Sequence, residues 1–110
     1  MLKGDEKEMR HRIGEACRAL KQFAKDNNTV VLLLSQMARR GDVNSRPGLQ
    51  DLKESGDIEA AADVAILNYR PKQDDQYTGL DELIVAKQRN GPIGPIPMRY
   101  VNETLTFETR

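Results

Sequence analysis

The segment Lys87–Pro92 places two cations beside a turn signal, directly after the apolar run 83–86. Residues i and i+2 of an extended chain point to the same face, so Lys87 and Arg89 should lie side by side. Asn90-Gly91 favours a tight hairpin turn, because both residues tolerate the positive φ that such a turn requires. An ammonium and a planar guanidinium held together suit a phosphate group. The alternative is a solvated basic hairpin without a ligand.

A second candidate residue follows the apolar run 29–34. The six residues of this run are aliphatic or β-branched and do not alternate with polar ones, which is typical of a strand covered on both faces in a parallel sheet. Ser35 and Gln36 come next, at the carboxyl end of that strand, where open α/β sheets bind ligands. Gln36 can donate and accept hydrogen bonds, which suits sensing a phosphate or positioning a water molecule.

The segment 37–57 predicts little regular structure beyond one helical turn within 49–53. An irregular segment of this length in a small domain is usually functional or disordered. Its cations could bind a phosphate backbone, and the amides of Ser55-Gly56 could assist as a backbone nest. The alternative is a mobile, solvated loop. The cations of this segment are Arg39, Arg40, Arg46 and Lys53.

The other elements must position these candidates. Apolar residues at steps of three and four predict an amphipathic helix, with Asp5 as its N-cap, Glu8 completing a capping box and a stop at 26–28. Pro95 and Pro97 indicate that the strand around them lies at a sheet edge, because proline cannot donate to a ladder. The remaining predicted elements are a helical turn at 58–62, a buried strand at 63–67, a polar loop at 72–79 and strands at 82–86, 96–101 and 105–107.

Composition excludes several classes of protein. With 17 basic and 17 acidic residues, the 110-residue chain has no overall field, so a site for a polyanion must be a local patch. Cys17 is the single cysteine and His11 the single histidine, which excludes an internal disulfide and a Cys/His metal cluster. No apolar run approaches the roughly 20 residues that span a bilayer. The first residues are charged, unlike a signal-peptide core. We therefore expect a cytoplasmic protein without membrane contact.

Several motifs occur together in a set order, and in this they resemble the C-terminal, RecA-like motor domain of the DnaB-type replicative DNA helicases of bacteria or phages. The resemblance runs from about residue 9 to residue 107. It implies an α/β fold with part of a RecA-like P-loop NTPase sheet, made of parallel strands plus a C-terminal antiparallel hairpin, and a single incomplete domain over residues 1–110. The motifs are Leu34-Ser35-Gln36, Arg46-Pro47, Asp51-Leu52-Lys53-Glu54-Ser55-Gly56, Ile58-Glu59, Ala62-Asp63 and Lys87-Gln88-Arg89-Asn90-Gly91-Pro92.

The resemblance also implies a function and roles for residues. These helicases hydrolyse ATP and unwind duplex DNA as hexameric rings around single-stranded DNA, with ATP bound between neighbouring subunits. Lys87 and Arg89 match the pair that reaches the neighbour's ATP, Arg89 being the arginine finger. Gln36 matches the glutamine that couples the nucleotide's phosphates to the DNA-facing loop. The residues that match this DNA-facing loop are Lys53, Glu54 and Gly56, with Arg46 as a further candidate DNA contact.

The sequence also departs from this family. Lys53 stands where the family more often has arginine, which keeps the charge but loses bidentate geometry. Ala60 and Ala61 replace polar residues, and the two prolines of the return strand are unusual. The sequence contains no G-x-x-x-x-G-K-[ST] loop and no apolar strand that ends in a Walker-B aspartate. We therefore expect ATP and Mg²⁺ to be bound by an intact parent ring, and the chain alone to bind neither and to lack ATPase activity.

Three interpretations follow. The chain is a fragment of a ring helicase, without the primase-facing N-terminal domain; or a non-catalytic module that docks on an intact ring; or a weak single-stranded DNA binder, whose affinity salt should reduce steeply. Large exposed apolar patches usually find a partner, so self-association is a further expectation. The residues expected to form such a patch are Val31, Leu33, Val64 and Ile66.

Overall fold

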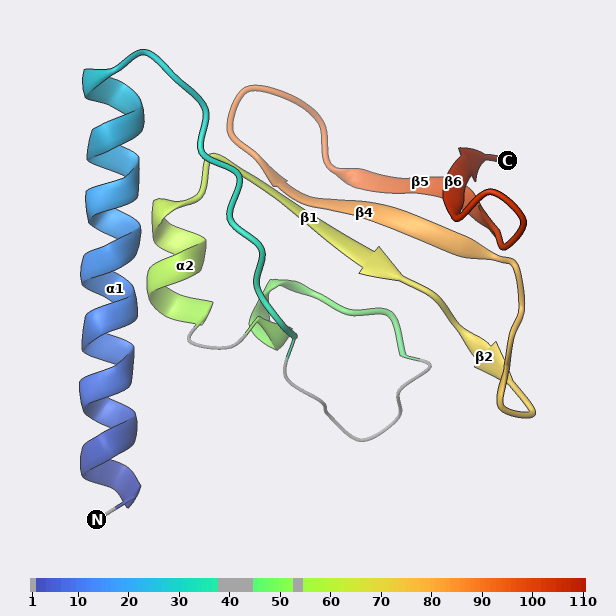
Figure 1. The fold of residues 1–110 in the computed structure, drawn as a ribbon, viewed down its shortest axis with the longest axis horizontal. Helices are drawn as coiled ribbons and strands as arrows, with labels where there is room; N and C mark the ends of the chain where they lie inside the picture. Colours follow the sequence, from blue (N-terminus) through green and yellow to red (C-terminus); the bar gives the residue numbers. More distant parts are fainter. Residues whose placement is uncertain (1, 38–44, 53–54) are drawn as a thin grey trace. The chain divides into compact units, whose positions relative to one another are not determined.

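A computed structural model of the chain describes residues 2–37, 45–52 and 55–110. It divides into two units: unit 1 comprises residues 1–38 and 52–62, and unit 2 comprises residues 39–51 and 63–110. Figure 1 shows the helices and strands along the chain. None of the helices in the part of the chain that the structure describes combines the length and apolar character that a membrane span requires.

Unit 1 is built on the helix α1 (Leu2–Asp26), against which the short helix α2 (Ser55–Ala61) packs. Within residues 7–26 of α1, Gly14 and Cys17 are buried, and Ile13, Leu20 and Ala24 around them are half-buried. These spacings of three and four confirm the predicted amphipathic helix, since they leave one face for a partner. Gly14 lies close to α2: a Cβ atom there would lie 2.7 Å from Oδ2 of Asp57, so a larger residue would displace this carboxylate side chain.

The end of α1 follows the prediction, whereas its start does not. Asn28 adopts a left-handed φ of 48°, and the amide of Thr29 donates to the carbonyl of Ala24 at 3.0 Å, as in a Schellman motif. The predicted stop at 26–28 is therefore confirmed. The helix begins at Leu2, so Asp5 lies inside it and is not its N-cap. Leucine and lysine are good helix formers, so residues 2 and 3 continue the helix beyond Asp5.

Cys17, for which the sequence indicated no role, is buried, with 6% of its surface exposed. Burial raises the pKa of its thiol, and the charge of Asp57 raises it further, while Arg18 acts in the opposite direction. Because the fold holds the thiol proton more tightly than the unfolded chain does, unit 1 should be stable below the ordinary thiol pKa and lose stability as the pH rises through the folded value.

We expect Cys17 to react with a thiol reagent more slowly than the urea-unfolded chain does at pH 8, because less thiolate is present and access is restricted. Asp57→Asn should speed the reaction, since it removes a charge that raises the thiol pKa. Labelling rates between pH 7 and 10 measure both effects. Equal rates for the folded and unfolded chains would contradict this assignment.

The apolar run 29–34 differs from its prediction. It is extended but belongs to no strand, and Val30, Leu32 and Leu34 are 90%, 86% and 86% exposed. The prediction of a parallel strand covered on both faces is therefore wrong for this segment. Aliphatic and β-branched residues favour a strand, but a strand forms only where another one offers hydrogen-bond partners. Among the described residues, no strand pairs with this segment.

Unit 2 contains a four-stranded sheet of β1 (Val64–Tyr69), β4 (Asp81–Gln88), β5 (Gly94–Val101) and β6 (Thr106–Thr109), in the order β1-β4-β5-β6. The predicted strands of this region are present, but the strand expected to be buried at 63–67 is not buried along its length: Val64 and Ile66 of β1 are 50% and 57% exposed, and Leu67 is buried. Every pair in the described sheets is antiparallel, which differs from the parallel strands expected before the C-terminal hairpin. The chain returns from β1 to β4 through a short hairpin, and a connection of this kind makes the neighbours antiparallel.

That short hairpin consists of β2 (Lys72–Gln73) and β3 (Gln76–Tyr77). Its two turn residues, Asp74 and Asp75, have φ of 52° and 63°, the pattern of a type I′ turn. The sequence predicted only a polar loop here, because Asp-Asp is a weaker turn signal than Asn-Gly or Asp-Gly.

The two prolines of β5 are tolerated by local geometry. The strand lies between β4 and β6, so it is not an edge strand over its whole length. The Pro97 carbonyl accepts a hydrogen bond from the Arg110 amide at 3.2 Å, where β6 has already ended. A strand residue directs its N–H and C=O to the same side, so the N–H that Pro97 lacks would also point past the end of β6. The edge prediction therefore holds for the first half of β5 only.

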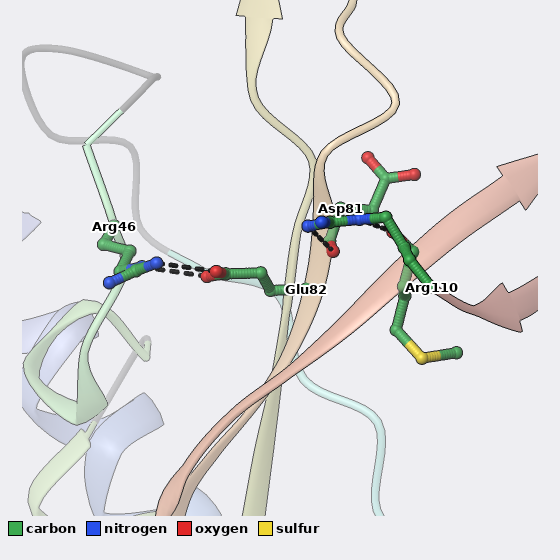
Figure 2. Close-up of polar contacts among 5 residues, drawn as sticks. Arg46, Asp81, Glu82 and Arg110 are labelled. Atoms are coloured by element: carbon green, nitrogen blue, oxygen red, sulfur yellow. Dashed lines mark hydrogen bonds and ion pairs between the residues drawn. The ribbon is translucent and has the colours of Figure 1, made fainter.

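The interior of unit 2 combines apolar and charged groups. Leu67 and Met98 are buried, and Asp81 is fully buried. The Asp81 carboxylate accepts a hydrogen bond from the Tyr100 amide at 2.9 Å and forms an ion pair with Arg70, whose Nε lies 3.4 Å from Oδ1. The Arg110 side chain lies in the same region and donates to the backbone carbonyls of Met98 at 2.8 Å and Asp81 at 3.2 Å (Figure 2).

Arg70 is also held by aromatic rings. Its guanidinium carbon lies 3.8 Å from the ring centre of Tyr77 and 4.5 Å from that of Tyr100. Tyr100 in turn packs edge-on against Phe107, with ring centres 5.0 Å apart. Cation–π contacts of this kind hold an arginine in place while it compensates a buried carboxylate. An open hollow of about 520 Å³ borders this cluster.

Candidate functional site

Lys87 and Arg89, which we call the cation tip, lie where β4 leaves the sheet. Lys87 is opposite Ala65 of β1 in the ladder, and the Arg89 amide donates to the Asp63 carbonyl at 3.0 Å. This bond extends the ladder by one residue pair beyond the strand ends. Since alternate residues of a ladder point to the same face, the two cations lie on one face of the sheet.

The turn after the cation tip differs from its prediction. The last pair between β4 and β5 is Val85 with Gly94, so a loop, not a two-residue turn, connects them. Asn90 and Gly91 are not among the described residues with positive φ. The end of β4 pairs with β1 instead, and this carries the chain away from β5 before the turn. The predicted tight Asn-Gly hairpin is therefore wrong.

Gln88 braces this loop, although the sequence indicated no role of its own for it. Its side-chain amide donates to the Pro92 carbonyl at 2.7 Å, and its backbone carbonyl accepts from the Gly91 amide at 3.4 Å. A Cβ atom at position 91 would lie 2.7 Å from the Gln88 side chain, so glycine leaves space for the brace. The cation tip is thus followed by a loop with an internal support.

Asp63 also belongs to this site, and sequence reasoning, which named it only within the motif Ala62-Asp63, missed its contact with Arg89. Its carboxylate Oδ1 lies 3.3 Å from Nε of Arg89, and the side chains are 61% and 52% exposed. The sequence did contain a signal: Asp63 comes directly before β1, and Arg89 comes directly after β4, the strand that pairs with β1. Reading this signal required the register between residues more than twenty positions apart, which the sequence does not provide.

Arg46 forms a bidentate ion pair with Glu82. Its Nε and Nη2 donate to the two carboxylate oxygens of Glu82 at 2.8 and 2.6 Å, as Figure 2 shows. The hydrogen bond to Glu82 and the charge of Glu82 raise the pKa of Arg46, while desolvation opposes them. Glu82 is 9% exposed, whereas the Arg46 side chain is 62% exposed. The buried carboxylate therefore fixes an arginine whose other edge faces outward.

The segment after Arg46 has its own local support. The 3₁₀ turn Leu49–Asp51 is stabilised by two bonds between Gly48 and Asp51: the Gly48 amide donates to Oδ2 of Asp51 at 2.8 Å, and the Asp51 amide donates to the Gly48 carbonyl at 3.0 Å. The helical turn expected within 49–53 is therefore present over its first three residues.

The remaining predicted site residues are distributed as follows. Gln36 belongs to unit 1, where it is exposed and follows the extended run 29–34. Gly56 is exposed in the first turn of α2, so Ser55-Gly56 starts a helix where the sequence predicted a loop nest. Lys53 and Glu54, like Arg39 and Arg40, lie outside the described residues. The described part of the chain contains no cluster of three or more histidine, cysteine or carboxylate side chains that could hold a metal ion.

The whole chain matches one protein family. Residues 1–109 match the family described as the DnaB-like helicase C-terminal domain. The chain belongs to this DnaB-like helicase family. The family assigned by resemblance from the sequence motifs is therefore confirmed.

Curated relatives agree with this DnaB-like assignment. The chain is 36% identical over 110 residues to the replicative DNA helicase DnaB of Geobacillus stearothermophilus, an alignment that covers 94% of this chain and 24% of that protein. It is 39% identical over 105 residues to a probable replicative DNA helicase of Trieres chinensis, covering 87% of this chain and 23% of the relative. The chain thus spans about a quarter of the length of the curated relatives it matches.

Solved structures show the same fold. One of them, described as an ATPase domain, superposes with a TM-score of 0.78 at 34% identity, covering 91% of this chain and 37% of that one. A DnaB-like replicative helicase, solved in a study of its interactions with primase, gives a TM-score of 0.76 at 34% identity, covering 89% of this chain and 25% of that one. The α/β, RecA-like fold class is therefore confirmed.

Proposed function

We propose that this chain supplies the C-terminal part of the motor domain of an ATP-dependent replicative DNA helicase. Such a helicase would act as a homohexameric ring that unwinds duplex DNA by moving along single-stranded DNA. The observation that carries the proposal is the DnaB-like match over residues 1–109, together with the cation tip at the end of β4.

The cation tip would act on ATP bound to the neighbouring subunit. Phosphoryl transfer requires positive charge on the γ-phosphate, and a finger supplied in trans links hydrolysis to ring assembly. Arg89 is the proposed arginine finger and Lys87 the accompanying point charge. The ladder to β1 and the Gln88 brace support these roles, since they hold the backbone on both sides of Arg89. Gln36 would couple the state of the phosphates to the DNA-facing loop.

Binding of ATP and its metal ion would require residues in addition to the cation tip. ATP would be held by a phosphate-binding loop, and the G-x-x-x-x-G-K-[ST] pattern of such a loop does not occur in this sequence. The described residues likewise contain no cluster that fits Mg²⁺. We therefore assign no step of hydrolysis to a metal held by this chain, and we propose that the chain alone does not hydrolyse ATP.

DNA would be contacted by the segment between Arg46 and Gly56, through Lys53, Glu54 and Gly56. Arg46 suits a phosphate contact, because Glu82 occupies only two of the five N–H donors of a guanidinium. Its exposed outer edge would then bind the DNA backbone, while the buried carboxylate fixes its orientation.

The function is tested by exchanging segments. The 110 residues of this chain replace the matching part of the Geobacillus stearothermophilus DnaB helicase, and ATP hydrolysis is measured with and without single-stranded DNA. We expect the exchanged ring to hydrolyse ATP and to be stimulated by DNA, and this chain alone to show no hydrolysis. An assembled ring without hydrolysis, or hydrolysis by the isolated chain, would contradict the proposal.

The DNA contact of Arg46 makes a separate prediction. If Arg46 binds a phosphate, Arg46→Ala should lower the affinity of the chain for oligo(dT) and reduce the slope of log affinity against log salt by about 0.7, the value for one contact on single-stranded DNA. Fluorescence anisotropy at several salt concentrations measures both.

The matched control is Arg99→Ala, which also removes an arginine paired with a carboxylate, Glu108, at 2.8 Å. The control should keep the wild-type salt slope. Arg46→Lys, which retains the positive charge, should keep most of the wild-type salt slope. An unchanged slope in Arg46→Ala would show that Arg46 binds Glu82 alone.

A further inference from the structure

Asp63 and Arg89 form a cross-strand pair one position beyond the last pair of the β1–β4 ladder, Val64 with Gln88. They are joined by the backbone bond from the Arg89 amide to the Asp63 carbonyl at 3.0 Å and by the ion pair between Nε of Arg89 and Oδ1 of Asp63 at 3.3 Å. Directly opposite residues of an antiparallel pair bring their Cβ atoms within about 5.5 Å, so the carboxylate is held beside the guanidinium by the backbone itself.

We propose that Asp63 is a positioning residue for Arg89: it holds the guanidinium at the cation tip and is displaced when a polyphosphate binds there. This inference rests on the proposed function, in which Arg89 acts on a phosphate. A carboxylate carries one negative charge, whereas a tripolyphosphate group carries several and offers more acceptor oxygens. The phosphate therefore replaces the carboxylate, and Asp63 keeps Arg89 oriented while no phosphate is present.

The strength of the pair suits such an exchange. Both side chains are more than half exposed, and exposed ion pairs contribute little net stabilisation. A pair of this strength orients a side chain without preventing its transfer to a more highly charged partner. The Arg46–Glu82 pair is the contrasting case in unit 2, because its carboxylate is buried and its two bonds are shorter.

The test titrates the whole 110-residue chain with inorganic tripolyphosphate and follows the backbone amide signals of residues 87–91 by NMR. Because Asp63 competes with the anion for Arg89, Asp63→Asn should tighten tripolyphosphate binding about two- to fivefold, the range expected for an exposed pair. Damage to the fold would weaken binding instead, so a gain separates positioning from a structural role.

Two controls make the result specific. In an Arg89→Gln background, Asp63→Asn should give no gain, because the competed cation is absent. Glu108→Gln makes the same charge change beside another exposed arginine, Arg99, and should leave binding at residues 87–91 unchanged. Equal affinities for the wild type and Asp63→Asn, or a gain that persists without Arg89, would overturn the proposal.

A second measurement uses the unmodified chain. Asp63 faces Nε of Arg89, whereas Glu108 faces Nη2 of Arg99. Tripolyphosphate should therefore shift the Nε–H signal of Arg89 and leave that of Arg99 in place. An Arg89 signal that tripolyphosphate leaves unshifted would also overturn the proposal. Neither experiment depends on ring activity, so failure of the segment exchange with success here leaves the Asp63–Arg89 assignment standing.

Discussion

Arg89→Ala should lower the ATPase kcat of the segment-exchanged DnaB ring by about 10³- to 10⁵-fold, the range in which arginine fingers contribute. The reason is electrostatic: a guanidinium near the γ-phosphate neutralises charge that is spread over its oxygens in the transition state. Alanine leaves that charge without a partner, whereas lysine restores a charge without the planar, bidentate donor. Arg89→Lys should therefore recover only part of the rate.

The loss must be separated from failure to assemble. Sedimentation should show that the Arg89→Ala ring has the size of the unsubstituted ring, because the side chain is half-exposed and its ion pair with Asp63 is weak. Arg99→Ala, on the same sheet, should retain nearly full activity. If assembled Arg89→Ala rings kept the rate of the parent ring, Arg89 would not be the finger.

A prediction in trans follows from the same role. Arg89→Ala subunits retain their own nucleotide pocket, so mixing them with subunits that have an intact Arg89 but a disabled pocket should restore part of the activity. The restored sites are those where an intact arginine meets an intact pocket. If mixing restored no activity, Arg89 would have to act within its own subunit.

Asp81→Ala should destabilise unit 2 by about 3–5 kcal/mol, the usual cost of removing one partner of a buried ion pair. Asp81 is fully buried and has two polar neighbours in different elements. Its removal leaves Arg70 without its carboxylate and the Tyr100 amide without its acceptor. An unpaired buried charge and an unsatisfied donor both oppose folding.

Urea unfolding measures this effect, because all three tyrosines (Tyr69, Tyr77 and Tyr100) lie in unit 2 and their fluorescence reports on it. Asp81→Asn keeps an oxygen for the Tyr100 amide but removes the charge, so its loss should be smaller. Glu103→Ala, at an exposed turn position, should change stability little. An Asp81→Ala midpoint close to the wild-type one would contradict the importance of the buried pair.

Local patterns were sufficient for the parts of the fold that depend on neighbours in sequence. The stripe from Ile13 to Ala24 identified α1, because helical periodicity is set by the chain itself. The motif residues around Gln36 and Lys87–Pro92 identified the family, which the comparisons confirm. The apolar run 29–34 was assigned wrongly, because a strand depends on a partner that composition does not specify.

The sequence by itself determined the amphipathic helix, the strand-forming runs of unit 2, the family and the two cations at positions 87 and 89. Only the tertiary structure decided the register of β1 against β4, and with it that Asp63 lies opposite Arg89. It also decided that Glu82 is buried and binds Arg46, and that Asp81 is buried and binds Arg70. Periodicity and turn preferences are local properties, whereas an ion pair between distant residues depends on strand register and burial, which arise only when the sheet assembles.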